Sequence, residues 1–241
     1  MWGRVEMKTV LFDLDGTLLP LDQDAFGKAY ILGMAKCMAP YGYDMQELIR
    51  GIWTGTGAMV KNDGAVTNEE VFWTTFSGLM GRDTRADEPH FLTYYQTEFQ
   101  KVRDVCGFEP KAAEVIGFLK NAGCRVALAT NPLFPQIATH SRARWAGLDP
   151  ADFDLITTYE NSRHCKPDPD YYRDVLAALG ETAENCIMVG NDVDEDMLAA
   201  SAVGIRTFLL TDCIINKHNA DVADIPQGGF PELLAFLKEN I

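Results

Sequence analysis

Two aspartates, separated by one residue, follow a short apolar run near the N-terminus. The run covers residues 9–12, and the acids are Asp13 and Asp15. Because alternate residues of a strand point to the same side, both carboxylates would leave the end of a buried strand together. Close carboxylates repel each other, so the pair needs a cation or a shared proton, and Mg²⁺ suits oxygen ligands best. The structural alternative is a strand that simply ends in an Asp-Gly turn at Gly16.

Polar side chains also follow three further predicted strands. Thr130 and Asn131 lie at the end of the strand predicted over 124–130. Lys166 follows the strand over 153–158, and an acidic cluster over 190–196 follows the strand over 186–189. Each could also have a purely structural role. Thr130 could cap a helix, Lys166 could be a solvated loop lysine, and the acidic cluster could be the first turn of a helix. In a parallel α/β sheet, however, these strand ends would meet at the edge where ligands bind. Together they supply a nucleophile, a cationic charge and an acid or base, which phosphoryl transfer requires.

The elements that would position these residues alternate between helix and strand after residue 107. Predicted strands cover 124–130, 153–158, 186–189 and 205–210, and predicted helices cover 110–122, 136–146, 169–179, 194–202 and 231–239. Such alternation predicts parallel pairing with right-handed crossovers. The predicted fold class is therefore α/β, a doubly wound parallel sheet built from residues 1–21 and 107–241.

Residues 22–106 carry a different pattern, with apolar residues at helical spacing and short loops. One stripe starts at Phe26, a second at Met45, a third after a capping box at Thr67, and a fourth at Phe91. This pattern predicts an α-helical bundle inserted after the first strand. The stretch 54–57, Thr-Gly-Thr-Gly, is interpreted as a loop that interrupts the second helix. Residues in this segment that could touch a leaving group are Trp53, Thr54, Thr56, Lys61 and Arg82.

Composition and charge argue against several kinds of binding partner and indicate a cellular compartment. The net charge of −14 disfavours nucleic acid and anionic membrane surfaces, and no apolar run approaches the roughly 20 residues of a membrane span. No G-x-G-x-x-G follows the first strand, which argues against a dinucleotide binder. The six scattered cysteines form no C-x-x-C pair, so we expect reduced thiols in the cytoplasm and no zinc site. The sequence carries no prediction of oligomeric state.

The four clusters resemble the motifs of the haloacid dehalogenase-like (HAD) hydrolase superfamily. Its Asp-x-Asp-Gly-Thr motif stands at residues 13–17, its Thr at Thr130, its Lys at Lys166 and its acidic motif at 190–196. The inserted helices are similar to one cap type of this superfamily. The resemblance implies a Rossmann-like catalytic core, 1–21 and 107–241, with a helical cap domain, 22–106.

The resemblance also implies a Mg²⁺-dependent phosphomonoester hydrolase that acts on a small phosphorylated metabolite through an aspartyl-phosphate. Asp13 would be the nucleophile, and Asp15 would protonate the leaving oxygen and then deprotonate water. Mg²⁺ would be held by Asp13, by the backbone carbonyl of Asp15 and by an acid of the fourth motif. Thr130 and Lys166, with Asn131 beside them, would bind the phosphoryl group.

One departure from the superfamily pattern concerns the metal ligand in the fourth motif. Where the family usually has Gly-Asp, this chain has Gly190, Asn191 and Asp192. An ungapped match gives Asn191 the ligand position, and a shift of one residue gives it to Asp192. Because a carboxylate binds Mg²⁺ better than a neutral amide, we predict Asp192 as the ligand. Asn191 and Asp196 are then supporting members of the acidic cluster.

Two alternatives to a hydrolase are a phosphomutase and a non-catalytic protein on the same fold. A phosphomutase of the β-phosphoglucomutase type would use the same core but protect its aspartyl-phosphate from water. A non-catalytic binding or regulatory protein would be expected to lack Asp13, Asp15 or Lys166, and all three are present. Dehalogenation needs no second acid, so Asp15 favours phosphoryl chemistry. Hydrolysis is the more common outcome in the superfamily and is the prediction retained here.

Overall fold

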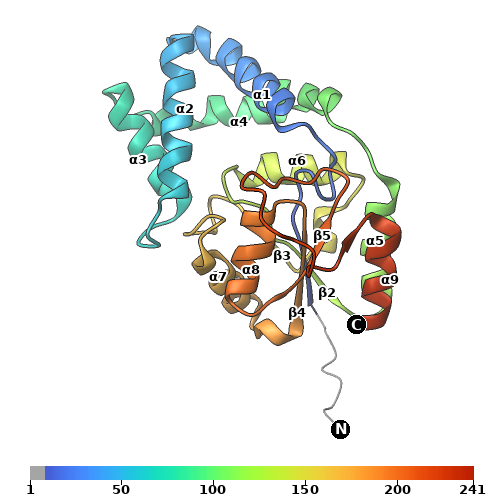
Figure 1. Cartoon of the computed structure of the whole chain (residues 1–241). Helices are drawn as coiled ribbons and strands as arrows, with labels where there is room; N and C mark the ends of the chain where they lie inside the picture. Colours follow the sequence, from blue (N-terminus) through green and yellow to red (C-terminus); the bar gives the residue numbers. More distant parts are fainter. Residues whose placement is uncertain (1–8) are drawn as a thin grey trace.

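A six-stranded sheet forms the centre of the computed structural model, which describes residues 9–241 (Figure 1). The strand order is β3-β2-β1-β4-β5-β6, and every neighbouring pair is parallel. The strands are β1 (Thr9–Phe12), β2 (Arg125–Leu128), β3 (Leu155–Ile156), β4 (Cys186–Gly190), β5 (Arg206–Leu210) and β6 (Gln227–Gly228). The chain runs outward from β1 in both directions, so the order reverses beside β1, at the kind of switch point where α/β sheets bind ligands. The predicted doubly wound α/β fold is confirmed.

Helices cover both faces of this sheet, which explains why its central strands are apolar on both sides. Val10 and Phe12 of β1 belong to one core cluster with helices on one face, whereas Leu11 belongs to a second cluster on the other face. The first face carries α5 (Pro110–Asn121) and α9 (Phe230–Asn240), and the second carries α7 (Pro169–Leu179) and α8 (Ala199–Ala202). Strand β1 is thus fully buried between two layers of helices.

A helical insertion, residues 22–106, lies beyond the carboxyl ends of the strands (Figure 1). Its helices are α1 (Gln23–Met38), α2 (Met45–Val60), α3 (Asn68–Met80) and α4 (Glu88–Gln96). The two chain segments that join it to the sheet run side by side, since Leu21 forms an antiparallel bridge with Cys106. The backbone N–H of Gly107 also donates to the carbonyl of Pro20 at 2.7 Å. The division into a core and a cap domain stays a prediction. Within residues 9–241 no helix is long and apolar enough to cross a membrane.

The prediction of a loop at 54–57 is wrong, because these residues lie inside α2. One of the glycines that suggested a break, Gly55, serves close helix packing instead, whereas Gly57 has open space around it. A Cβ atom on Gly55 would lie 2.6 Å from the ring of Phe72 on α3, so only glycine lets the two helices approach this closely. At Gly55 this packing offsets the loss of helix propensity, which is about 1 kcal/mol for a glycine. Trp53 and Thr56 are consequently presented from a continuous helix.

Three smaller differences concern where an element ends and which type of helix forms. The predicted fourth helix ends at Gln96, where Thr97 leaves helical geometry, and it continues as a 3-10 helix, Glu98–Val105 (η3). The strand predicted over 153–158 is shortened to Leu155–Ile156. The helix predicted from residue 194 begins as a π-helical turn, Val193–Leu198 (η6), before α8. The capping box at Thr67 is present as predicted.

Candidate active site

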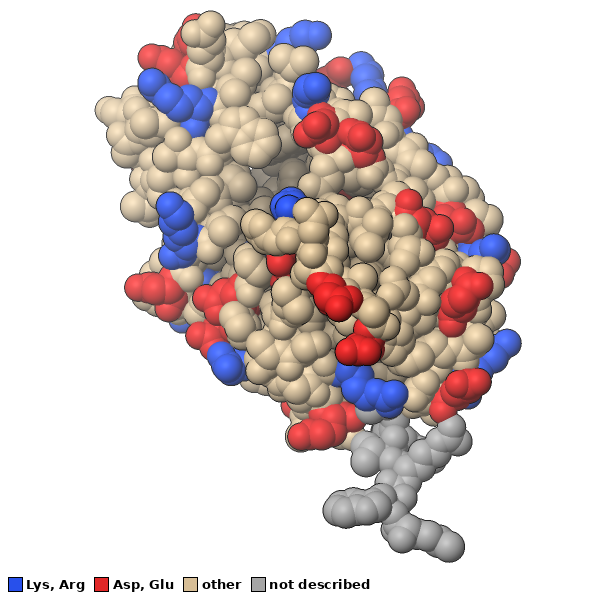
Figure 2. Space-filling model, viewed as in Figure 1, with Lys and Arg blue, Asp and Glu red and all other residues tan. Residues whose placement is uncertain are grey.

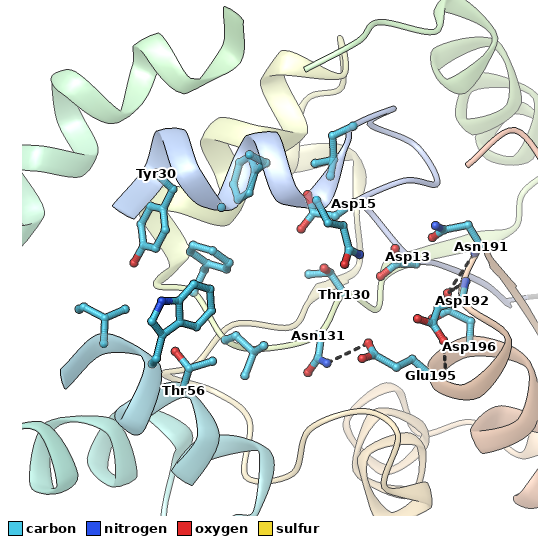
Figure 3. Close-up of a pocket in the computed structure, with 18 residues that line it drawn as sticks. Asp13, Asp15, Tyr30, Thr56, Thr130, Asn131, Asn191, Asp192, Glu195 and Asp196 are labelled. Carbon is cyan, nitrogen blue, oxygen red and sulfur yellow. Dashed lines mark hydrogen bonds between the residues drawn. The ribbon is translucent and has the colours of Figure 1, made fainter. Parts of the chain in front are cut away.

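The residues predicted from the strand ends converge on one cavity of about 230 Å³ between the sheet edge and helices α1 and α2 (Figure 3). β1, β2 and β4 each contribute from their carboxyl ends, as the parallel topology requires. Among the predicted strand-end residues, only Lys166 is absent from the lining, and it is buried. Of the residues predicted in the helical insertion to touch a leaving group, Trp53 and Thr56 line the cavity, whereas Thr54, Lys61 and Arg82 do not. The predicted residues that line the cavity are Asp13, Asp15, Thr130, Asn131, Asn191, Asp192 and Asp196.

The turn after β1 is fixed against the end of β4. Gly16 has φ +88°, and a Cβ atom there would collide with the side-chain amide of Asn191. The Thr17 hydroxyl lies 2.9 Å from Asn191 Oδ1 and 3.3 Å from Asp13 Oδ2, within donating distance of both. The amide nitrogen of Asn191 donates to the carbonyl of Cys213 at 2.7 Å. Asn191 therefore holds the turn that carries both aspartates, whichever residue binds metal.

A buried lysine joins the first and fourth motifs. Lys166 Nζ lies 3.0 Å from Asp13 Oδ1 and 2.6 Å from Asp196 Oδ1. Burial alone disfavours the ammonium, but these two carboxylates raise the pKa of Lys166 well above its ordinary value. Asp196 also accepts the backbone N–H groups of Asn191 and Asp192, at 3.1 and 3.0 Å. A permanent positive charge is thus held against Asp13.

Arg142 is a site residue that the sequence prediction missed. It lies on α6 (Gln136–Trp145), is fully buried, and its guanidinium pairs with Asp15 Oδ2. The guanidinium also lies 4.2 Å from the ring centre of Phe134. The signal available in the sequence was a charged residue at helical spacing from Ala138 and Trp145. An arginine is rarely fully buried unless it is paired.

The surroundings of Asp15 raise the pKa of its carboxyl group above the ordinary value. Burial raises its pKa, and the nearby Asp13 carboxylate acts in the same direction, while Arg142 opposes both. One carboxylate oxygen, Oδ1, is buried with no protein partner, whereas Oδ2 is held by Arg142. Arg142 therefore orients Asp15 through Oδ2, and Oδ1 is available for proton transfer.

The side chains of Asp192 and Asn131 both form hydrogen bonds within the protein. Asp192 Oδ1 accepts the N–H groups of Asp194 and Glu195, each at 2.9 Å, and so caps the helical turn that follows. Its Oδ2 lies 3.8 Å from Nζ of the exposed Lys217. The Asn131 amide nitrogen donates to Glu195 Oε2 at 2.9 Å, and its buried Oδ1 has no partner among the described residues. Phosphate binding by Asn131 stays a prediction, and it would require the amide to exchange partners.

The charge balance of the cavity suits a bound divalent cation. Five carboxylates line it, and within residues 9–241 two buried cations, Lys166 and Arg142, pair with them. In the part of the chain that the structure describes, no three His, Cys, Asp or Glu side chains gather into a metal-binding group. Mg²⁺ commonly binds through one or two carboxylates and keeps several waters, so this donor set fits it without such a group.

Comparison with known proteins decides the family. A model of the haloacid dehalogenase-like hydrolase family matches residues 7–204. The chain belongs to this family. Its predicted motifs at 13–17, Thr130, Lys166 and 190–196 all fall inside the matched range. This member of the haloacid dehalogenase-like hydrolases is therefore an enzyme of the hydrolase class.

Individual relatives of this haloacid dehalogenase-like hydrolase include phosphatases. The chain is 27% identical over 203 residues to a ribulose-1,5-bisphosphate 5-phosphatase of Halopiger xanaduensis, covering 83% of each chain. It is 30% identical over 217 residues to a phosphoglycolate phosphatase of Rhodospirillum rubrum, covering 85% of this chain and 79% of the relative. The fold matches the HAD-hydrolase YfnB of Bacillus subtilis, bound to magnesium, with a TM-score of 0.57, 21% identity, and 97% and 99% of the chains covered.

Proposed function

We propose that the protein is a Mg²⁺-dependent phosphomonoester hydrolase that acts on a small phosphorylated compound through an aspartyl-phosphate. The observation that carries the proposal is the pairing of two aspartates of one cavity with two different buried cations. Lys166 lies 3.0 Å from Asp13, and Arg142 pairs with Asp15. The names of the curated relatives, a ribulose-bisphosphate phosphatase and phosphoglycolate phosphatases, support phosphoryl chemistry.

In the first step, an oxygen of Asp13 attacks phosphorus and the ester oxygen departs. Asp15 gives its proton to that oxygen, so the alcohol leaves neutral and Asp13 carries the phosphoryl group. In the second step, Asp15 takes a proton from water, the water oxygen attacks phosphorus, and the bond to Asp13 breaks. The products are the alcohol and inorganic phosphate, and both aspartates return to their starting states.

Positive charge and metal would both act on the phosphoryl oxygens. Lys166 supplies a fixed ammonium beside the nucleophile, and the Thr130 hydroxyl, at the end of β2, can donate to the same oxygens. Asp13, the backbone carbonyl of Asp15 and Asp192 would hold Mg²⁺. When bound, the metal would offset the charge that gathers on the transferring group. Arg142 holds Asp15 in position for its proton transfers.

The proposal includes a cytoplasmic location. All six cysteines are free thiols in the structure, which suits a reducing compartment.

Hydrolysis of p-nitrophenyl phosphate with and without Mg²⁺ tests the proposal. We expect Mg²⁺-dependent turnover that falls at least about 1,000-fold in Asp13→Asn, since removal of a nucleophile removes the covalent route. Asp224→Asn is the matched control, because Asp224 is exposed and lies outside the cavity. Equal turnover by Asp13→Asn and wild type would refute the assignment of the nucleophile. Transfer of the phosphoryl group to a second acceptor alcohol, in place of water, would identify a mutase instead.

A further inference from the structure

The half of the cavity away from the aspartates has apolar walls. Helices α1 and α2 contribute Phe26, Tyr30 and Trp53, and the loop after β2 contributes Leu133 and Phe134. In Figure 3, Tyr30 and Thr56 lie at one end of the cavity and the acidic cluster at the other. A substrate whose phosphoryl group meets Asp13 would therefore direct its alcohol part toward these rings.

No basic residue lines the cavity among residues 9–241. Lys166 and Arg142 are both buried and each is already paired with an aspartate. Lys217 is exposed and approaches Asp192, at the phosphoryl end. Figure 2 shows a hollow between the helical insertion and the part below it, with mostly uncharged atoms around it and a basic side chain at its lower rim.

A second anionic group on the alcohol would meet a poor environment there. It would lose water without contacting a basic side chain of the described cavity lining, and the five carboxylates of the opposite end would repel it. An apolar group would instead displace water from aromatic surface, which is favourable. The enzyme should therefore distinguish between substrates more strongly by the charge of their alcohol part than by its size.

We infer that the substrate is a phosphomonoester of an uncharged alcohol with an apolar body about the size of one six-membered ring. This inference rests on the proposed function and narrows its substrate class. About 150 Å³ of apolar space holds one benzene ring. The cavity of about 230 Å³ therefore has room for a ring and a phosphoryl group. The inferred substrate differs in charge from those named for the relatives, ribulose bisphosphate and phosphoglycolate, which carry a second acidic group.

The first test compares benzyl phosphate with 4-carboxybenzyl phosphate, using wild-type protein and Mg²⁺. These esters share the same leaving oxygen and methylene group, so they differ chiefly in the added carboxylate. We expect kcat/KM to be at least about 30-fold higher for benzyl phosphate, because the carboxylate would be left buried and unpaired. Equal values, or a preference for the carboxylated ester, would overturn the inference.

Variants on α2 test whether this wall sets the preference. Thr56→Lys places a cation at the apolar end, and we expect it to reduce the preference for benzyl phosphate at least about 10-fold. Thr54→Lys is the matched control, because Thr54 is exposed on the same helix and does not line the cavity. Equal effects of the two variants would show that the wall near Thr56 does not contact the substrate, and would overturn the inference.

Binding separates failure of this inference from failure of the proposed function. Calorimetry would measure binding of benzylphosphonate and 4-carboxybenzylphosphonate to the wild-type protein with Mg²⁺. If wild type hydrolyses none of the esters, including p-nitrophenyl phosphate, the proposed function fails. Tighter binding of benzylphosphonate would still support the apolar pocket. Equal binding, or no binding of either compound, would overturn the inference itself.

Discussion

Replacement of Arg142 by methionine tests the least expected part of the site. Methionine keeps much of the apolar volume but removes the guanidinium that pairs with Asp15. At an effective dielectric constant of 20, two charges 4 Å apart attract by about 4 kcal/mol. About a quarter of the Asp15 side chain is exposed, 24%, so water screens part of this attraction. We therefore expect a loss of about 2 kcal/mol in the free energy of unfolding at neutral pH.

The catalytic effect of Arg142→Met should depend on the leaving group. p-Nitrophenolate departs without help from an acid, whereas benzyl alcohol requires a proton from Asp15. We expect kcat to fall about 100-fold for benzyl phosphate, and clearly less for p-nitrophenyl phosphate, because a misplaced acid affects mainly the poorer leaving group. Steady-state kinetics with both esters, together with urea unfolding, would measure these changes.

Two controls make this prediction specific. Arg144→Met removes an exposed arginine from the same helix, and we expect both kinetics and stability to remain close to wild type. In a double-mutant cycle, Arg142→Met should add little to the kinetic loss caused by Asp15→Asn, because both act on one proton transfer. Additive losses, or equal losses for the two esters, would refute the positioning role of Arg142.

Three further perturbations test other parts of the structure. Lys166→Met should abolish turnover of p-nitrophenyl phosphate and lower stability by about 3 kcal/mol in urea unfolding, because it leaves buried carboxylates unpaired. Gly16→Ala should destabilise by at least about 1 kcal/mol because φ is +88°, whereas Gly57→Ala, with open space around it in α2, should stabilise slightly in thermal melts. The Tyr43 hydroxyl donates to Asp87 at 2.7 Å and lowers the pKa of Asp87 below 3.8. Tyr43→Phe should therefore cost about 1 kcal/mol at pH 7, and the difference from wild type should shrink as the pH falls below about 3.8, where the unfolded Asp87 becomes protonated. A difference that does not change with pH would contradict that linkage.

The parts of the fold that local sequence signals govern were predictable. Alternation of helix and strand fixed the parallel sheet, and parallel strands bring their carboxyl ends to one edge. That is why Asp13, Thr130 and Asp192 could be placed together before the structure was known. The capping box at Thr67 is likewise a signal contained within four residues.

The features that were missed depend on contacts between distant segments. Gly55 suggested a loop, and only its closeness to Phe72 of α3 explains a glycine inside a helix. The role of Arg142 depends on Asp15, which is 127 residues away in the sequence. Neither contact has a local signature beyond an unusual residue type. The sequence thus indicated the chemistry of the strand ends better than the residues that position it.

Trapping of the phosphorylated protein tests the central claim most directly. Wild type and Asp15→Asn would be mixed with p-nitrophenyl phosphate and Mg²⁺, quenched, and reduced with borohydride, which converts an aspartyl-phosphate to homoserine. Mass spectrometry of the peptides would then locate the modified residue. The proposed mechanism predicts homoserine at position 13, with more of it in Asp15→Asn, because loss of the base slows hydrolysis of the intermediate. Turnover with homoserine at no position, or at another aspartate, would contradict Asp13 as the nucleophile.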